Sequence, residues 1–171
     1  MFNFTFIKRI IFVFGLTYMA LPLQAHIFSQ QEIKSFASGL IQKAPASLRI
    51  KLKKTLNTGL LGIDEDDKKI VFSDAEKQFI IQHVLPRIQE MTWLTKINLS
   101  GFGLTKMPEG FEKLSNLVEL DISHNRIKSI PFAFFSIPNL QILDFSHNRL
   151  ELLSDQIVKI AGLTVLNLKD N

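Results

Sequence analysis

The chain has 171 residues, a formal net charge of +4 and no cysteine. This length suits one compact domain, and the lack of cysteine excludes disulfide bonds, thiol catalysis and cysteine metal sites. Residues 26–171 carry a net charge of only +2, and the basic cluster at 49–54 is too short for the basic stripe that binds nucleic acid. We therefore expect no nucleic-acid partner.

Residues 1–25 have the outline of a secretory signal peptide. Lys8 and Arg9 precede an apolar run at 10–23, and Ala25 marks the expected cleavage site. The run is shorter than the roughly 20 residues that a membrane-spanning helix needs. The sequence therefore predicts an exported protein, secreted or periplasmic. A large leucine three residues before the cut keeps a membrane-anchored form, with the segment uncleaved, as the alternative.

The region 26–93 is predicted to be helical. Ser29 with Glu32, and Ser73 with Glu76, each fit a capping box that begins a helix. Prolines should end these helices at about residues 45 and 86. A third helix is indicated by an apolar stripe of three residues: Leu48, Leu52 and Leu56. We expect these helices to cover one end of the sheet described next.

An acidic run at 64–67 lies between the predicted helices. Counted from Asp64, a calcium-binding EF-hand loop needs Gly at the sixth position and Glu at the twelfth, where this chain has Lys69 and Ala75. The match fails, so the run is interpreted as a solvated loop.

Residues 94–171 consist of one sequence unit that is repeated. Leucines recur every 23 residues, and segments 117–131, 140–153 and 163–171 follow the pattern L-x-x-L-x-L-x-x-N-x-L. The apolar positions 1, 4 and 6 alternate with polar ones, which is typical of a short strand. The residues that open the four copies are Leu94, Leu117, Leu140 and Leu163.

This region resembles the leucine-rich repeat family, in three full copies and one partial copy covering about 46% of the chain. The resemblance implies an α/β solenoid with a short parallel sheet on its concave side, and the region 26–93 then forms a helical N-terminal cap. Many animal extracellular members carry cysteine-rich end caps, so the absence of cysteine favours a bacterial origin. Position 9 should hold a structural ladder of Asn125, Asn148 and Asn171.

The first copy departs from this pattern, because Phe102 replaces the asparagine and lies between Gly101 and Gly103. Terminal repeats are often atypical. Upstream residues also match the outer arc of a degenerate preceding copy, with a plain capping helix as the alternative. The matching residues are Pro86, Ile88, Met91 and Leu94.

The concave face is the predicted site for a protein or peptide partner, because rigid concave solenoids suit extended ligands. Positions 3, 5, 7 and 8 of each copy should be exposed there. The candidate contact residues are Lys96, Asn98, Glu119, Asp121, Ser123, His124, Ile142, Asp144, Ser146, His147 and Asn167.

Two other features have competing interpretations. His124 and His147, with Asp121 and Asp144, could bind zinc, but the repeat itself explains their spacing and we expect no metal. Phe132 and Phe135 occupy outer-arc positions and form a candidate apolar contact patch. The alternative is that both phenylalanines tuck under the helical cap or against the rear of the wedge.

No catalytic motif is present: G-x-S-x-G, H-E-x-x-H and a phosphate-binding G-x-x-x-x-G-K are absent. We therefore expect no enzyme activity, no cofactor and no small-molecule substrate. The function indicated is an exported protein-interaction module. The alternative is a membrane-anchored structural or envelope protein that self-associates through its repeats.

The last copy, at 163–171, stops at its ninth position, without the outer arc that would cover its strand. Native sheets usually protect such an edge by capping, charge or pairing. The sequence therefore predicts either a fragment of a longer repeat protein or end-to-end self-association through the strand at 163–168.

Overall fold

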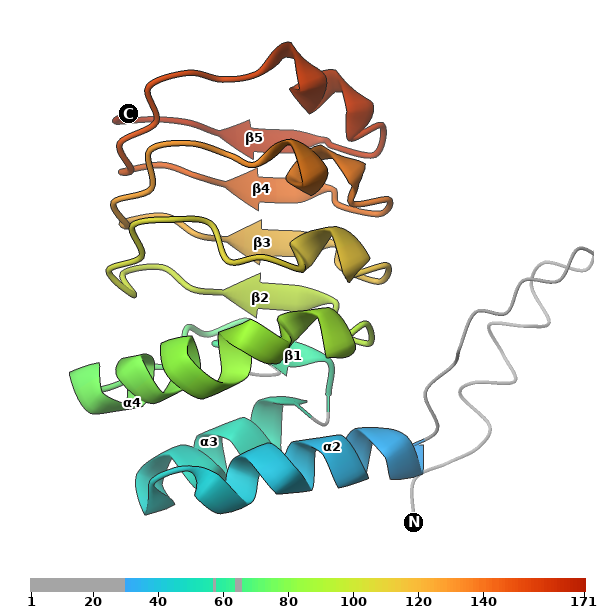
Figure 1. Cartoon of the computed structure of the whole chain (residues 1–171), viewed down its shortest axis with the longest axis vertical. Helices are drawn as coiled ribbons and strands as arrows, with labels where there is room; N and C mark the ends of the chain where they lie inside the picture. The colour runs from blue at the N-terminus through green and yellow to red at the C-terminus, as the bar shows by residue number, and fades with distance from the viewer. Residues whose placement is uncertain (1–29, 57, 64–65) are drawn as a thin grey trace, which may run out of the picture.

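The computed structural model describes residues 30–56, 58–63 and 66–171. Five short strands stack in chain order, β1 to β5, into one parallel sheet, and the segments between them run along the opposite, outer side (Figure 1). This is the predicted α/β solenoid. The predicted signal peptide and the cap residue Ser29 lie outside the described residues. No helix in the described part of the chain is long and apolar enough to cross a membrane.

Two helices close one end of the sheet (Figure 1). They are α2 (Gln30–Lys43) and α3 (Ala46–Leu56), and Pro45 separates them because its ring cannot continue a helix. The apolar stripe of α3 is fully buried, and the indole Nε1 of Trp93 donates a hydrogen bond of 3.0 Å to the Leu56 carbonyl. These contacts attach the helical pair to the first strands.

Strand β1 (Leu60–Leu61) lies within the region predicted to be helical. It pairs in parallel with β2 (Lys96–Asn98), with Leu60 opposite Lys96. Gly62 makes this approach close: its φ is +80°, and a Cβ there would lie 2.0 Å from the Asn98 carbonyl oxygen. The sheet therefore begins one unit earlier than the repeat pattern indicates.

A helical segment connects β1 to β2 along the outer side. It begins as α4 (Asp74–Phe79), whose predicted capping box between Ser73 and Glu76 is confirmed, and it continues through η1 (Ile80–Val84) and η2 (Leu85–Glu90). The α-helical part ends at Phe79, and the helical path continues past Pro86 to Glu90, so Pro86 does not end the helix as predicted. Pro86 lies in the first turn of η2, where its missing N–H is not needed. This helix occupies the outer arc of the unit that starts at β1. The residues upstream of the repeats therefore form a preceding unit of the solenoid, as one interpretation predicted, and its outer arc is a helix, as the other predicted.

The repeats stack in strict register. The sheet continues through β3 (Glu119–Asp121), β4 (Ile142–Asp144) and β5 (Val165–Asn167), and each paired residue is 23 positions from its partner. Short 3-10 helices form the outer arcs, and the apolar residues at positions 1, 4 and 6 are fully buried in the middle units. The arcs are η3 (Phe111–Lys113), η4 (Phe132–Ser136) and η5 (Asp155–Lys159).

Asparagines at position 9 bond the backbone within and between units. Asn125 Nδ2 donates to the carbonyls of Leu99 and Ile122, and its Oδ1 accepts from Leu104 N at 2.9 Å. Asn148 and Asn171 repeat the arrangement one and two units later. The first copy has Phe102 in place of this amide. The Phe102 ring packs edge-on against Phe72, with centroids 5.7 Å apart.

Candidate functional site

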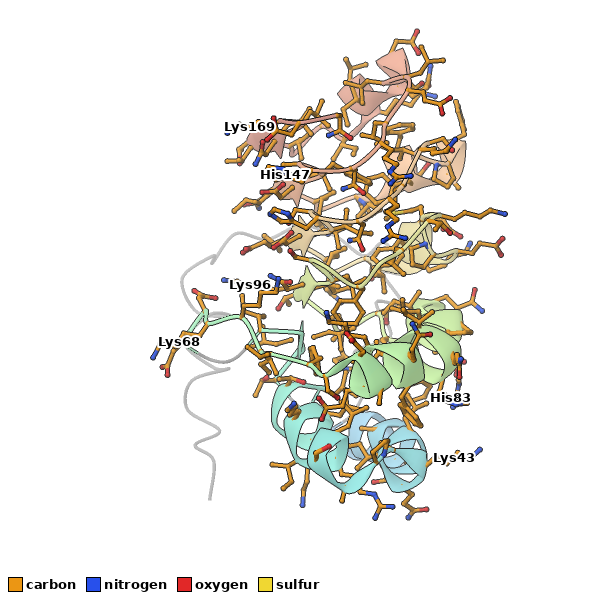
Figure 2. All side chains as sticks on the ribbon, turned by 90° about the vertical axis from the view of Figure 1, so that its left-hand side faces the viewer. Lys43, Lys68, His83, Lys96, His147 and Lys169 are labelled. Carbon is orange, nitrogen blue, oxygen red and sulfur yellow. The ribbon has the colours of Figure 1, made fainter. Side chains whose placement is uncertain are left out.

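The candidate surface is the strand side of the sheet, opposite the helices and arcs. Figure 2 shows Lys96, His147 and Lys169 along this side and His83 on the outer side. We describe it one repeat position at a time, because each position forms a row across neighbouring strands.

Position 3 changes from charged to apolar along the sheet. Lys96 Nζ lies 2.6 Å from Asp67 Oδ1 and 3.4 Å from Glu119 Oε2, and the hydrogen bond with Asp67 is the main reason that the pKa of Lys96 is raised. On the next strands, Ile142 is half-buried and Val165 is 50% exposed. The row therefore presents an ion-paired end and an apolar end.

The Asp67 contact was missed in the sequence, where the acidic run was interpreted only as a solvated loop. Asp64 and Glu65 lie outside the described residues. Asp67, with a φ of 58°, binds Lys96 and so attaches the loop after β1 to the strand side of the sheet. No local signal could have indicated a contact between residues 29 positions apart.

Position 5 forms a row of two carboxylates flanked by two amides. Asn98 Nδ2 donates to Asp121 Oδ2 at 2.8 Å, and Asn167 Nδ2 donates to Asp144 Oδ2 at 2.9 Å. The two aspartates are paired residues on adjacent strands, so their carboxylates are neighbours between the two amides. This arrangement places two negative charges at the centre of the surface.

Each of these carboxylates is also held by the serine two residues later. Ser123 donates to Asp121 Oδ1 from its backbone N at 2.9 Å and from Oγ at 2.6 Å. Ser146 donates to Asp144 Oδ1 in the same way, at 2.8 and 2.6 Å. Burial raises the pKa of Asp144, but the bonds from Ser146 and Asn167 outweigh it, and the net pKa is lowered. Asp144 is therefore held rigidly in its charged form, and equivalent bonds from Ser123 and Asn98 fix the position of Asp121.

The serines themselves correct a prediction. Ser123 and Ser146 were expected to be exposed at position 7, but each is only 5% exposed. The hydroxyl oxygens of Ser123 and Ser100 lie 2.9 Å apart beneath the surface. Because Ser123 donates its single hydroxyl proton to Asp121, it accepts from Ser100 in this pair. Ser123 and Ser146 are thus buried groups that position the aspartates. Asn98 is also buried, at 9% exposed.

The histidines at position 8 are exposed and stacked. The rings of His124 and His147 are 4.2 Å apart and nearly parallel, and His147 Nδ1 lies 3.2 Å from Asp170 Oδ2. Both residues adopt a left-handed backbone, with φ of 54° and 53°. Within the described residues, no three His, Asp or Glu side chains are placed to hold a metal ion together.

Only one of the two phenylalanines predicted to form the outer-arc patch is exposed. Phe132 is 64% exposed, and Lys159 Nζ lies 4.8 Å from its ring centroid. Phe135 is 1% exposed, because it packs in the wedge edge-on to Phe134. The prediction that Phe135 belongs to a contact patch is therefore wrong, and the alternative, a side chain packed inside the wedge, is correct for that residue.

A cavity of about 630 Å³ on the outer side was also missed. It lies between the helical segment η1–η2 and the chain at 103–109, and its apolar walls include Ile81, Leu85, Leu104 and Met107. It arises because a helix and a repeat arc of different shape are adjacent. The sequence indicated neither the length nor the path of that helix.

Comparisons with known proteins agree with the repeat architecture. The family model for the leucine-rich repeat matches residues 92–150 and 115–171. No curated protein matches the chain.

Solved structures give two similar chains among others. An internalin from Listeria monocytogenes is 23% identical, covers 47% of this chain and 23% of its own, and has a TM-score of 0.43. The leucine-rich repeat ectodomain of a receptor kinase from Arabidopsis thaliana is 28% identical, covers 50% of this chain and 61% of its own, and has a TM-score of 0.38. This chain spans less than two thirds of either structure. The matched repeats and the stacked parallel sheet show that residues 92–171 are leucine-rich repeats.

Proposed function

We propose that this chain is an exported, non-enzymatic module that binds a protein or peptide along the strand side of its sheet. Leucine-rich repeat proteins generally mediate protein–protein interactions. The signal-like residues 1–25 and the absence of cysteine support export from a bacterial cell.

The observation that carries the proposal is the preorganised pair Asp121 and Asp144 beside an apolar end at Ile142 and Val165. The carboxylates are held by serine and asparagine donors, so binding a cationic group costs little ordering entropy. Ile142 and Val165 lie in the position 3 row of the same sheet, next to the position 5 row that holds the aspartates. Their side chains make no hydrogen bonds that a partner must replace. This chemistry fits an extended peptide with a basic side chain next to an apolar one.

Introducing positive charge at the apolar end tests the proposal. The double variant Ile142→Arg/Val165→Arg should weaken binding of peptides selected from a random library by at least about tenfold, because it removes apolar contact and repels a basic partner. Affinity would be measured by fluorescence anisotropy. The matched control is Val71→Arg/Val158→Arg, at 81% and 80% exposed positions away from this surface.

Unchanged affinity in the Ile142→Arg/Val165→Arg variant, with an unchanged melting curve, would place the partner elsewhere on the molecule. Selected peptides without basic residues would contradict the role given to the aspartates.

Export makes a separate prediction. When the full chain is expressed in a bacterial host, the protein outside the cytoplasm should begin at His26, because Ala25 is the expected cleavage site. N-terminal sequencing of the exported protein checks this. A mature chain that still begins at Met1 would favour the anchored alternative, and a chain confined to the cytoplasm would contradict both.

A further inference from the structure

The outer cavity of about 630 Å³ is a groove that follows the helical segment beginning at α4. One wall is a single stripe of that segment, spanning an interval of 11 residues, or roughly 16 Å of helix. The stripe consists of Gln78, Ile81, Leu85 and Gln89. The other wall is the segment 103–109 of the first repeat, whose Leu104 and Met107 are buried. An extended peptide of about five residues matches this length.

A backbone donor is unused beside this groove, because a helix takes the place of a preceding repeat. In the two later copies, position 10 donates to the unit before it: Arg126 N to Leu104 O at 2.7 Å, and Arg149 N to Ile127 O at 2.9 Å. The equivalent donor of the first copy is Gly103 N, which makes no hydrogen bond within the described residues. Gly103 is exposed and lines the groove. The groove therefore offers a main-chain donor to a ligand.

A second cavity, of about 220 Å³, continues the groove between the arcs of the first two repeats. Residues 107–109 line both cavities and form the ridge that separates them. The walls of the second cavity include two small residues at position 17, Gly110 and Ala133, where the third copy has Gln156. Because a cavity of about 150 Å³ already holds a benzene ring, this one can hold an aromatic or a large aliphatic side chain.

The charged residues around the two cavities are mostly acidic. The lining contains Glu109 and Glu112 but only one basic residue, Lys106. Among the described residues, neither carboxylate has an ion-pair or hydrogen-bond partner. Glu109 lines both cavities, so its charge lies at the ridge between them. A basic side chain of a ligand is therefore complementary to this ridge.

We propose that the outer groove binds an extended peptide segment of a partner protein, at a site separate from the strand side of the sheet. The peptide lies along residues 103–107, and one of its main-chain carbonyls accepts from Gly103 N. Its apolar side chains enter the two cavities, and a basic side chain pairs with Glu109 and Glu112. Main-chain bonding holds an extended chain, whereas the cavities and the carboxylates select its side chains. The site does not depend on the proposed function of the strand side.

Peptides selected on the immobilised full chain from a displayed library of random peptides provide the probe. The expected sequences combine large apolar residues with a basic one. Glu109→Lys should weaken their binding at least about tenfold, because it places a repelling charge at the ridge. Asp155→Lys is the matched control, since Asp155 is exposed at the same repeat position two units later and lines neither cavity. It should change the affinity by less than about twofold.

Filling the second cavity gives an independent variant. Ala133→Gln introduces the residue that the third copy carries at this position, so the repeat should fold with an unchanged melting curve. The peptide then loses the place of one apolar side chain, and its affinity should fall at least about tenfold. Ala161→Gln makes the same change at an exposed position outside both cavities and serves as the control. Fluorescence anisotropy measures each affinity.

The main-chain contact has a readout of its own. In a nitrogen-15-labelled chain, saturation with a selected peptide should slow deuterium exchange of the Gly103 amide by at least about tenfold. The Arg149 amide, which is already bonded to Ile127 O, should show little change. A Gly103 amide that exchanges equally fast with and without the peptide would overturn the extended geometry and assign the groove to a helical ligand.

Comparison with Ile142→Arg/Val165→Arg separates this site from the strand side. Peptides weakened by that double variant alone would overturn the outer site and leave the strand-side proposal standing. Peptides weakened only by Glu109→Lys and Ala133→Gln would support the outer site and contradict the strand-side one. Selected peptides rich in acidic residues, peptides that bind the parent and both groove variants equally, or a selection that yields no binder tighter than about 100 μM would overturn the outer site.

Discussion

Replacing Asn148 with alanine is expected to lower the free energy of unfolding by about 4 kcal/mol. Its buried amide donates to the carbonyls of Ile122 and Phe145 at 3.0 Å, and its Oδ1 accepts from Ile127 N at 3.1 Å. Alanine has no polar group, so these buried backbone groups would lose their partner. The change would be measured by urea denaturation.

Asn171 offers a matched control, because it makes the same bonds one unit later but is exposed. Water can replace its amide, so Asn171→Ala should cost only about 1 kcal/mol. The exposed Asn139, which donates to Ser115 O at 2.6 Å, should cost about as little. Equal losses for Asn148→Ala and Asn171→Ala would show that burial does not determine the strength of the ladder.

The second large effect concerns Glu76, which joins α3 to the start of α4. Its Oε2 accepts from Lys51 Nζ at 2.6 Å and from Ser73 N at 2.9 Å, and its side chain is only 4% exposed. Burial disfavours the charged form, but the hydrogen bonds from Lys51 and Ser73 outweigh it and lower the pKa of Glu76 to about 2.

The pKa is lower in the folded state than the value of 4.5 expected for the unfolded chain, so unfolding takes up a proton below that value. The stabilisation by Glu76 is therefore present in full above about pH 5 and is lost as the pH falls towards 2. Its size is about 3 kcal/mol. The difference in unfolding free energy between the parent and Glu76→Gln, followed against pH, should fall over this range.

Glu90→Gln provides the comparison for an exposed pair. Glu90 forms an ion pair of 2.8 Å with Arg87, with both side chains more than 40% exposed, so its removal should cost less than about 1 kcal/mol. A Glu76→Gln variant that is as stable as Glu90→Gln at pH 7, or whose difference from the parent does not change with pH, would contradict the assignment.

The repeat register could be read from the sequence because it is local and periodic. Apolar residues at positions 1, 4 and 6 must be buried whichever neighbours they meet, and an asparagine at position 9 can bond the backbone groups where the strand ends inside the core. The capping box of Ser73 and Glu76 is local in the same sense, since both partners lie within one helical turn. Each of these features depends on residues that are close in the chain.

Tertiary structure alone decided the remaining features, because they depend on which units lie side by side. Strand β1 has two residues and no repeat signal, and only its pairing with β2 makes it a strand. Phe132 and Phe135 share one 3-10 turn, yet only Phe135 points into the wedge. The buried serines and the ion pair between Asp67 and Lys96 likewise require the stacked sheet and the loop beside it. Periodicity thus determined which side chains enter the core, whereas packing between distant segments determined which polar groups are held rigid and which surfaces stay open.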